Sequence, residues 1–240
     1  MQLYMGSWGA YGWHYLPWIA KRSGVSPSPS SSSSSSSSPS PSPSSSTPAT
    51  RTLCRLVHAE YLCVGILAFQ TWDFVASCTM PEHYVTEFLV HHVLSAITAY
   101  MALEYRMVHH YAIFFGGCSE ISSIFLVWVN MDQYFPASNI GSSVWTTFIM
   151  MNQGIFVIAF IAYRIVGWIA VSIPLWKDVM SVLPQPAKHY RPGKVWFLRV
   201  FLFMDVALGA LQVYWFMTGL LPKVIEVVAT ATREQPQMTS

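Results

Sequence analysis

Beyond residue 50 the chain alternates long apolar runs with short polar segments. Each run reaches the roughly 20 residues that a bilayer core requires, and none shows the two-residue alternation of a membrane β-barrel strand. Because backbone amides cannot stay unpaired in lipid, such runs are expected to be helices. The pattern predicts five membrane-spanning helices, at about residues 53–77, 84–103, 108–129, 144–173 and 195–221.

Two prolines fall near the ends of the later runs. Pro174 follows the fourth run and Pro222 follows the fifth. Proline has no amide hydrogen to donate and its ring crowds the preceding turn of a helix. We therefore expect Pro174 to bend or stop the fourth helix and Pro222 to end the fifth.

The first 50 residues differ in composition from the rest. Residues 1–22 are rich in Trp and Tyr, but glycines and Pro17 interrupt any helical period, so no secondary structure is predicted for this aromatic extension. Residues 23–50 form a Ser/Pro tract that buries too little apolar surface to offset its conformational entropy, which predicts a disordered linker. The transmembrane domain is then expected at residues 51–223, with a short polar tail at 224–240.

Composition places the chain in a membrane. It is 53% hydrophobic and only 10% charged, against about 25% charged residues in soluble domains. The net charge of +2 is dispersed along the chain, which argues against nucleic acid as a partner. The four cysteines lack CxxC or metal-type spacing and are interpreted as small apolar core residues. The fold class predicted is all-α, a polytopic bundle of about five spans behind a disordered linker.

Basic residues predict the orientation of the bundle. With five spans, seven Lys and Arg residues fall on one side, and the loops around Glu82 and Asp132 on the other side contain none. By the positive-inside rule, the linker and the 175–194 loop are expected to be cytoplasmic. The basic residues are Arg51, Arg55, Arg106, Lys177, Lys188, Arg191 and Lys194.

Ionisable residues interrupt several of the runs. Such groups cost at least about 2–3 kcal/mol each in hydrocarbon, and they usually face a partner, a cavity or a ligand. Helical spacing puts Glu87, His91, Ser95 and Thr98 on one face of the second helix, so we expect the polar faces to point inward. The predicted polar cluster consists of His91, His92, Glu120, Glu87, Ser119, Asp73, Arg164 and Asp205.

Two interpretations of this cluster stay open. The first is hydrogen-bonded packing, with His91 or His92 bonded to Glu120 and Arg164 bonded to Asp205. The second is an intramembrane site for a lipid headgroup or acyl chain. A di-iron centre is disfavoured because the chain lacks an HxxHH box, so neither a metal nor a cofactor is predicted. Acid–base chemistry by a histidine remains open in principle.

Three sequence segments carry a resemblance to a known family. They are WDF at residues 72–74, EFLVHHVLSAITAY at 87–100 and GGCSEISSIFLVWVN at 116–130. Together they resemble the TLC domain, which translocating-chain-associated membrane proteins, longevity-assurance ceramide synthases and the neuronal ceroid lipofuscinosis ER membrane protein share. The resemblance covers about residues 53–221. Within the family the chain is most similar to TLC domain-containing proteins implicated in membrane phospholipid composition.

The ceramide synthase branch offers a more specific comparison. Its histidine pair matches His91 and His92, and the end of its HDxSD run aligns with Ser119 and Glu120. Gly116 and Gly117 stand where that run has its His and Asp, which removes the expected proton-transfer pair. The resemblance therefore favours a protein without a catalytic residue over an enzyme.

The resemblance implies a function at membranes. It favours a membrane protein that binds phospholipid or sphingolipid and influences membrane lipid composition. It also implies residence in the endoplasmic reticulum, with the plasma membrane as the alternative. The competing hypotheses are an acyl-CoA-dependent sphingoid base N-acyltransferase and a cargo or translocon accessory protein of the endoplasmic reticulum.

Overall fold

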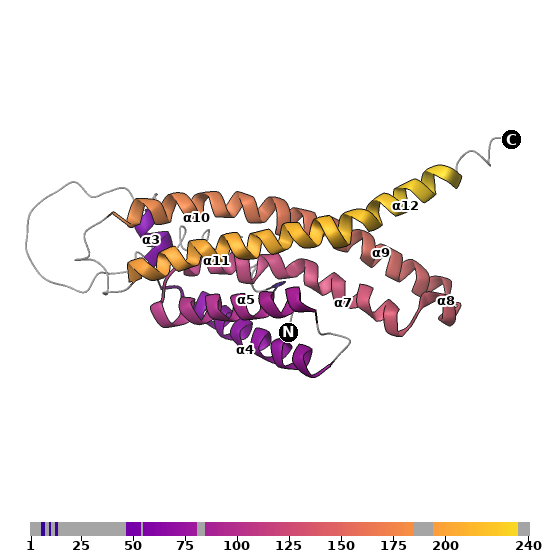
Figure 1. The fold of residues 1–240 in the computed structure, drawn as a ribbon, viewed down its shortest axis with the longest axis horizontal. Helices are drawn as coiled ribbons and strands as arrows, with labels where there is room; N and C mark the ends of the chain where they lie inside the picture. Colours follow the sequence, from indigo (N-terminus) through magenta and orange to yellow (C-terminus); the bar gives the residue numbers. More distant parts are fainter. Residues whose placement is uncertain are drawn as a thin grey trace, which may run out of the picture.

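The computed structural model describes residues 6, 7, 10, 13, 47–53, 55–80, 85–184 and 194–234. All regular structure in these residues is helical (Figure 1), which confirms the predicted fold class. Most of the predicted Ser/Pro linker, most of residues 1–22 and the end of the C-terminal tail lie outside the described residues. The main helices are α3 (Pro48–Leu53), α4 (Val57–Thr79), α5 (Thr86–Tyr105), α6 (His109–Gly116), α7 (Ile121–Tyr134), α8 (Ala137–Ile140), α9 (Ser143–Ala159), α10 (Trp168–Val182), α11 (Lys194–Trp215) and α12 (Leu221–Glu234).

Four helical stretches of the described chain are long and apolar enough to cross a membrane. They are Val57–Thr79, His109–Asp132, Ser143–Val182 and Trp196–Val227. The remaining predicted helix is α5, which carries Glu87, Glu104 and the histidine pair. The outer surface is rich in large apolar side chains; Trp72 is 70% exposed and Val144 is 77% exposed. Soluble proteins rarely expose such surfaces over a wide area, so the chain is an integral membrane protein.

The two later helices do not end at their prolines. A π-helical segment, η3 (Phe160–Gly167), joins α9 to α10, and the helix continues through Pro174 to Val182. A second π-helical segment, η5 (Phe216–Leu220), joins α11 to α12, which begins just before Pro222. The prediction that Pro222 ends the fifth helix was therefore wrong, and Pro174 does not stop the fourth. Membrane helices tolerate proline because neighbouring helices and local π adjustments satisfy the freed carbonyl groups.

The helices form an elongated bundle (Figure 1). α4 and α5 pack against each other as an antiparallel pair on one side, and the long α9–α10 and α11–α12 rods run along the other. The α7–α8–α9 turn and α12 extend past the α4–α5 pair at one end. The main buried core lies between α6, α10 and α11, where Tyr111, Val179 and Leu198 are almost fully buried.

The opposite end of the bundle holds a network of basic residues. Arg51 on α3 makes a bidentate ion pair with Asp178 on α10, with Nε–Oδ2 and Nη2–Oδ1 distances of 2.5 and 2.6 Å. The hydroxyl of Tyr111 also donates to Asp178, and the hydrogen bond to this carboxylate raises the pKa of Arg51. Nearby, Arg55 donates two hydrogen bonds to Glu60 at 2.6 and 2.7 Å. The ion pair between Arg51 and Asp178 thus fixes α3 to α10 at this end of the bundle.

Candidate functional site

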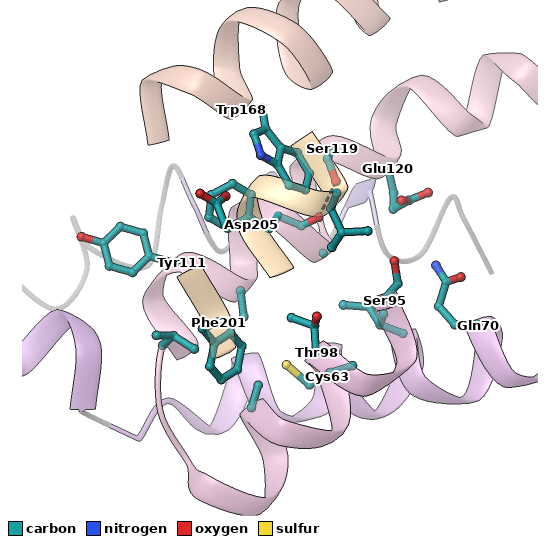
Figure 2. A pocket seen from close by; sticks show the side chains of 18 of the residues that line it. Cys63, Gln70, Ser95, Thr98, Tyr111, Ser119, Glu120, Trp168, Phe201 and Asp205 are labelled. Carbon is teal, nitrogen blue, oxygen red and sulfur yellow. Dashed lines mark hydrogen bonds between the residues drawn. The ribbon is translucent and has the colours of Figure 1, made fainter. Parts of the chain in front are cut away.

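A cavity lies inside the bundle between the α4–α5 pair and the other helices (Figure 2). Its enclosed volume is about 90 Å³, and the cavity is partly open to the outside; this is smaller than the roughly 300–1,000 Å³ of typical small-molecule sites. One part of its wall is polar and another is apolar. Figure 2 shows Gln70, Ser95 and Glu120 on one side, with Phe201 and Tyr111 on the other. The polar side chains of the wall include Gln70, His91, Ser95, Thr98, Ser119, Glu120, Arg164, Asp205 and Gln212.

Arg164 organises the polar part of the wall. Its guanidinium donates from Nη2 to Glu120 Oε1 at 3.2 Å and from Nη1 to Gln212 Oε1 at 3.0 Å. Two serine hydroxyls of α7 accept further bonds, from Nε at 2.8 Å and from Nη2 at 2.7 Å; they belong to Ser122 and Ser123. The second oxygen of Glu120 accepts from Ser123 at 2.7 Å. The buried charge of Arg164 is therefore matched by one carboxylate and by neutral acceptors.

Arg164 forms its ion pair with Glu120 and not with Asp205, the partner that one interpretation of the sequence proposed. Asp205, the expected partner, accepts hydrogen bonds from Ser172 at 2.8 Å and from Trp176 Nε1 at 2.9 Å. Arg164, in the π-helical segment η3, still reaches α11, but it does so at Gln212, which lies two helical turns beyond Asp205 on the same face. The ion pair therefore links η3 to the helix of Glu120 and not to α11.

His92 forms a second polar group with residues of α4. Its Nδ1 donates to Gln70 Oε1 at 2.5 Å, and its Nε2 lies 3.5 Å from Asp73 Oδ2. The structure thus places Asp73 and Gln70 next to His92. In the part of the chain that the structure describes, neither His92 nor His91 forms the hydrogen bond to Glu120 that one interpretation proposed.

His91 faces the cavity with one nitrogen unsatisfied. Its Nδ1 is shielded from solvent and has no hydrogen-bond partner among the described residues. The ring is held edge-on against Trp215, at a centroid distance of 5.2 Å, and against His92 at 5.6 Å. A buried polar nitrogen without a partner costs about 1–3 kcal/mol. Neighbouring atoms cover this nitrogen, so a ligand would reach it only if the side chains around it moved.

Comparison with known proteins bears on the identity of this bundle. The family model for the TLC domain matches residues 3–219, most of the chain. The chain belongs to the TLC-domain family. No curated protein and no solved structure matches it. The match confirms the resemblance that the histidine pair and the residues after Gly116 suggested, and it covers the domain that the branches of the family share.

The TLC-domain match begins ahead of the Ser/Pro tract. Two described residues from that part of the chain contact the bundle. The ring of Trp13 lies 5.2 Å from that of His110 and 5.3 Å from that of Phe114. A side chain at Gly6 would meet Ile124 Cδ1 at 3.0 Å. These contacts place residues 6 and 13 against α6 and α7.

Two other predicted residues, Glu87 and Ser119, form hydrogen bonds within the protein. Glu87 is exposed and accepts a hydrogen bond from the hydroxyl of Tyr214 at 3.0 Å, which ties α5 to α11. Ser119 lines the cavity, but its hydroxyl donates to the carbonyl of Phe115 at 2.5 Å. Glu87 therefore secures the wall from outside, whereas Ser119 has already used its donor.

Gly116, which stands where the ceramide synthase pattern has its His, has a packing role. A Cβ atom built on Gly116 would lie 2.1 Å from Ile66 Cδ1 on α4. The helices α4 and α6 approach each other at this point because Gly116 has no side chain, as membrane helix interfaces commonly require. With Ile66 in place, an imidazole at position 116 would not fit.

Gln70 and Ser122 were absent from the predicted cluster. Gln70 stands three residues before Asp73, so both lie on one helical face, and that spacing was the available signal. Ser122 carries no comparable signal, because serine is common in membrane helices whether or not it has a partner. Among the described residues, no group of three or more His, Cys, Asp or Glu side chains is arranged to hold a metal ion.

Proposed function

We propose that this TLC-domain protein binds lipid in its intramembrane cavity and thereby influences the lipid composition of the membrane. The observation that carries the proposal is the two-part wall of the cavity. Polar side chains around His91 and Arg164 occupy one part, and apolar ones such as Phe201 and Leu208 occupy another. An amphiphile has the same division, so its headgroup and chain would each meet a matching surface.

The membrane setting supports a lipid as the ligand. The cavity lies within helices whose outer faces are apolar, and it is partly open to the outside. A lipid reaches such a site from the bilayer without crossing water. The side chains of His91, Ser95 and Thr98 line the cavity and are polar groups that a lipid headgroup would meet. Phospholipid and sphingolipid are both candidates, and we propose the endoplasmic reticulum as the membrane concerned.

The packing at Gly116 favours binding over acyl transfer. The ceramide synthase pattern has a His followed by an Asp where this chain has Gly116 and Gly117. A side chain at position 116 would require Ile66 to move, because its Cδ1 atom would lie 2.1 Å from a Cβ built on Gly116. The enzyme hypothesis makes a separate prediction, that membranes containing the protein form labelled ceramide from acyl-CoA and a long-chain base. Formation of ceramide above the level of empty membranes would overturn the non-enzymatic proposal.

The proposal is tested by lipidomics on cells that lack the protein. We expect re-expression of the wild-type chain to restore the lipid profile, and His91→Ala and Glu120→Ala at equal abundance to fail. His58→Ala is the matched control, because His58 is exposed and lies outside the cavity. Full restoration by both cavity variants would contradict a function of the polar wall.

A further inference from the structure

An open groove lies on the outer face of the bundle, between α10 and α11, which run side by side (Figure 1). Its volume is about 490 Å³, within the roughly 300–1,000 Å³ of small-molecule sites, whereas the interior cavity encloses about 90 Å³. Three of its lining residues, Ile169, Ile173 and Val206, are 55%, 51% and 55% exposed. The groove therefore opens toward the hydrocarbon of the bilayer.

The floor of this groove has almost no free hydrogen-bonding group. Asp205 stands there, but its two carboxylate oxygens accept hydrogen bonds from Ser172 at 2.8 Å and from Trp176 Nε1 at 2.9 Å. Trp168 packs against Gly209, where a Cβ atom would lie 3.0 Å from the indole nitrogen. The surface that the groove exposes is thus almost entirely apolar, and it suits a hydrocarbon chain better than a headgroup.

Two basic side chains stand at the end of the groove nearest α3. Lys177 lines the groove beside Asp178, the residue that holds α3. Arg199 lies about 9 Å before Asp205 along α11, at 1.5 Å per residue, and it shares a helical face with Val206. Both basic side chains are exposed, and in the described part of the chain neither forms an ion pair. The apolar groove therefore ends at free positive charge.

Tryptophan marks the same end as the level of the lipid headgroups. Trp176 precedes Lys177 and is 37% exposed, and Trp196 lies one turn before Arg199 and is 63% exposed. Tryptophan is enriched where the hydrocarbon meets the headgroups. The positive-inside rule predicts that this end faces the cytoplasm, and the cytoplasmic leaflet carries the anionic lipids that basic sites between membrane helices bind.

We infer that the groove between α10 and α11 binds an anionic phospholipid of the surrounding leaflet. The phosphate lies at Lys177 and Arg199, and one acyl chain follows the apolar groove past Val206. The second chain stays in the bilayer, so the groove holds only one. A zwitterionic lipid would bring its own cation toward the two basic residues, and a neutral lipid would leave them unpaired. This site goes beyond the function proposed for the interior cavity, which none of these three residues lines.

The test compares three lipids that have identical dioleoyl chains and headgroups of different charge. They are phosphatidylglycerol, phosphatidylcholine and diacylglycerol, each offered at equal concentration to the full-length protein after delipidation in detergent. Native mass spectrometry measures the bound fraction of each lipid. We expect phosphatidylglycerol to occupy the protein about ten-fold more than phosphatidylcholine, because two basic residues attract its net charge. Equal binding of these two phospholipids overturns the inference.

Paired substitutions test whether the two basic residues of the groove carry the preference. We expect Lys177→Gln/Arg199→Gln to bring phosphatidylglycerol binding down to the level of phosphatidylcholine. The control Arg106→Gln/Lys223→Gln removes the same charge from exposed positions outside the groove, and it should keep the wild-type preference. Retention of the preference in the groove variant, or equal loss in the control, contradicts the assignment to Lys177 and Arg199.

Bulky substitutions test the place of the acyl chain. Val206→Trp fills the groove, and we expect it to lower phosphatidylglycerol binding several-fold. Val213→Trp adds the same ring two turns further along the same face of α11, at a residue that is 48% exposed and outside the groove, and should bind as the wild type does. Ile173→Trp repeats the test from the facing helix if Val206→Trp does not elute as a single species. Equal binding by the groove and control variants overturns the acyl-chain assignment. None of the substituted residues lines the interior cavity, so that result leaves the function proposed for the cavity in place.

Discussion

Arg164 and Glu120 stand 44 residues apart in the chain and meet in the interior of the bundle. Each would be expensive alone in this setting, because an ion without a counter-charge loses its hydration and gains nothing in return. Together with Gln212 and two serines they form a network in which every charged atom has a partner. Such networks hold helices in one relative arrangement, and this one joins three separate segments of the bundle.

Removal of Glu120 alone is therefore expected to be severe. Breaking a buried ion pair by removing one partner typically costs about 3–5 kcal/mol, and Glu120→Ala would leave Arg164 with only neutral partners. The double variant Glu120→Ala/Arg164→Leu removes the stranded charge, so we expect it to be more stable than Glu120→Ala. The measurement is thermal unfolding in detergent followed by size-exclusion chromatography. A double variant less stable than Glu120→Ala would show that the ion pair with Glu120 is not what offsets the cost of burying the charge of Arg164.

Sequence identified the polar residues more readily than their partners. Apolar runs make His91, Glu120 and Arg164 conspicuous, because each breaks a pattern that lipid enforces. Pairing depends on how far one helix is shifted along another, and Arg164 meets α11 at Gln212, two turns from Asp205. The sequence has no simple signal for this shift, which explains why Asp205 was considered as the partner of Arg164.

At the scale of helices, close approach at glycine shapes the wall of the cavity. Gly116 lets α6 contact Ile66 of α4, whereas a Cβ built on Gly154 of α9 would meet nothing within 4 Å. Both glycines lie in helices, where alanine is favoured over glycine by about 1 kcal/mol. A change of glycine to alanine therefore gains helix propensity at both positions, but only at Gly154 is there space for the added methyl group.

This pair gives a matched prediction. We expect Gly154→Ala to raise thermal stability and Gly116→Ala to lower it relative to Gly154→Ala, because overpacking costs about 1–3 kcal/mol. Adding Ile66→Val removes the Cδ1 atom that a new Cβ would meet, and it should recover part of the loss in Gly116→Ala. Equal stability of the two alanine variants in detergent melts would contradict the packing seen at Gly116.

The short helix α3 is anchored in part by the ion pair between Arg51 and Asp178, in addition to the buried Thr52, whose carbonyl accepts a hydrogen bond from the amide of Val108 at 2.6 Å. Arg51 reaches the buried carboxylate of Asp178, whose side chain is 4% exposed, whereas Arg55 pairs with Glu60 at the surface. Exposed pairs contribute about 0–1 kcal/mol. We expect Arg51→Gln to increase hydrogen exchange across residues 47–53 and to lower stability, and Arg55→Gln to change both little. Similar exchange in the two variants would rule out an anchoring role for Asp178.

Helix boundaries were predicted well at the start of each run and poorly beyond the prolines. Apolar runs end where polar residues gather, but nothing in their composition separates a helix that stops at Pro222 from one that bends and continues. Neighbouring helices supply the missing partners for the backbone, so the outcome is decided by packing and not by the proline alone.

On the scale of the whole molecule, the rods are longer than a bilayer is thick. The helical stretch from Ser143 to Val182 has 40 residues, or about 60 Å at 1.5 Å per residue, against a hydrocarbon core of about 30 Å. Part of the bundle therefore stands outside the hydrocarbon. Arg51, Arg55 and Arg106 gather at the end that carries α3, since the last two both approach Glu60. The opposite end carries the α7–α8–α9 turn (Figure 1).

This separation of charge makes the orientation testable. The positive-inside rule predicts that the end with α3 faces the cytoplasm, so Arg55→Cys and Asn139→Cys, both at exposed positions, should lie on opposite sides of the membrane. Both are placed in a Cys54→Ser/Cys78→Ser background, because the remaining Cys63 and Cys118 are buried. We expect an impermeant maleimide to label Arg55→Cys in cells whose plasma membrane alone is permeabilised. Asn139→Cys should need full detergent, because α8 then faces the lumen. Labelling of both positions before detergent would place the two ends of the bundle on one side of the membrane. Labelling of Asn139→Cys alone before detergent would show the opposite topology, with the basic end facing away from the cytoplasm, against the positive-inside rule.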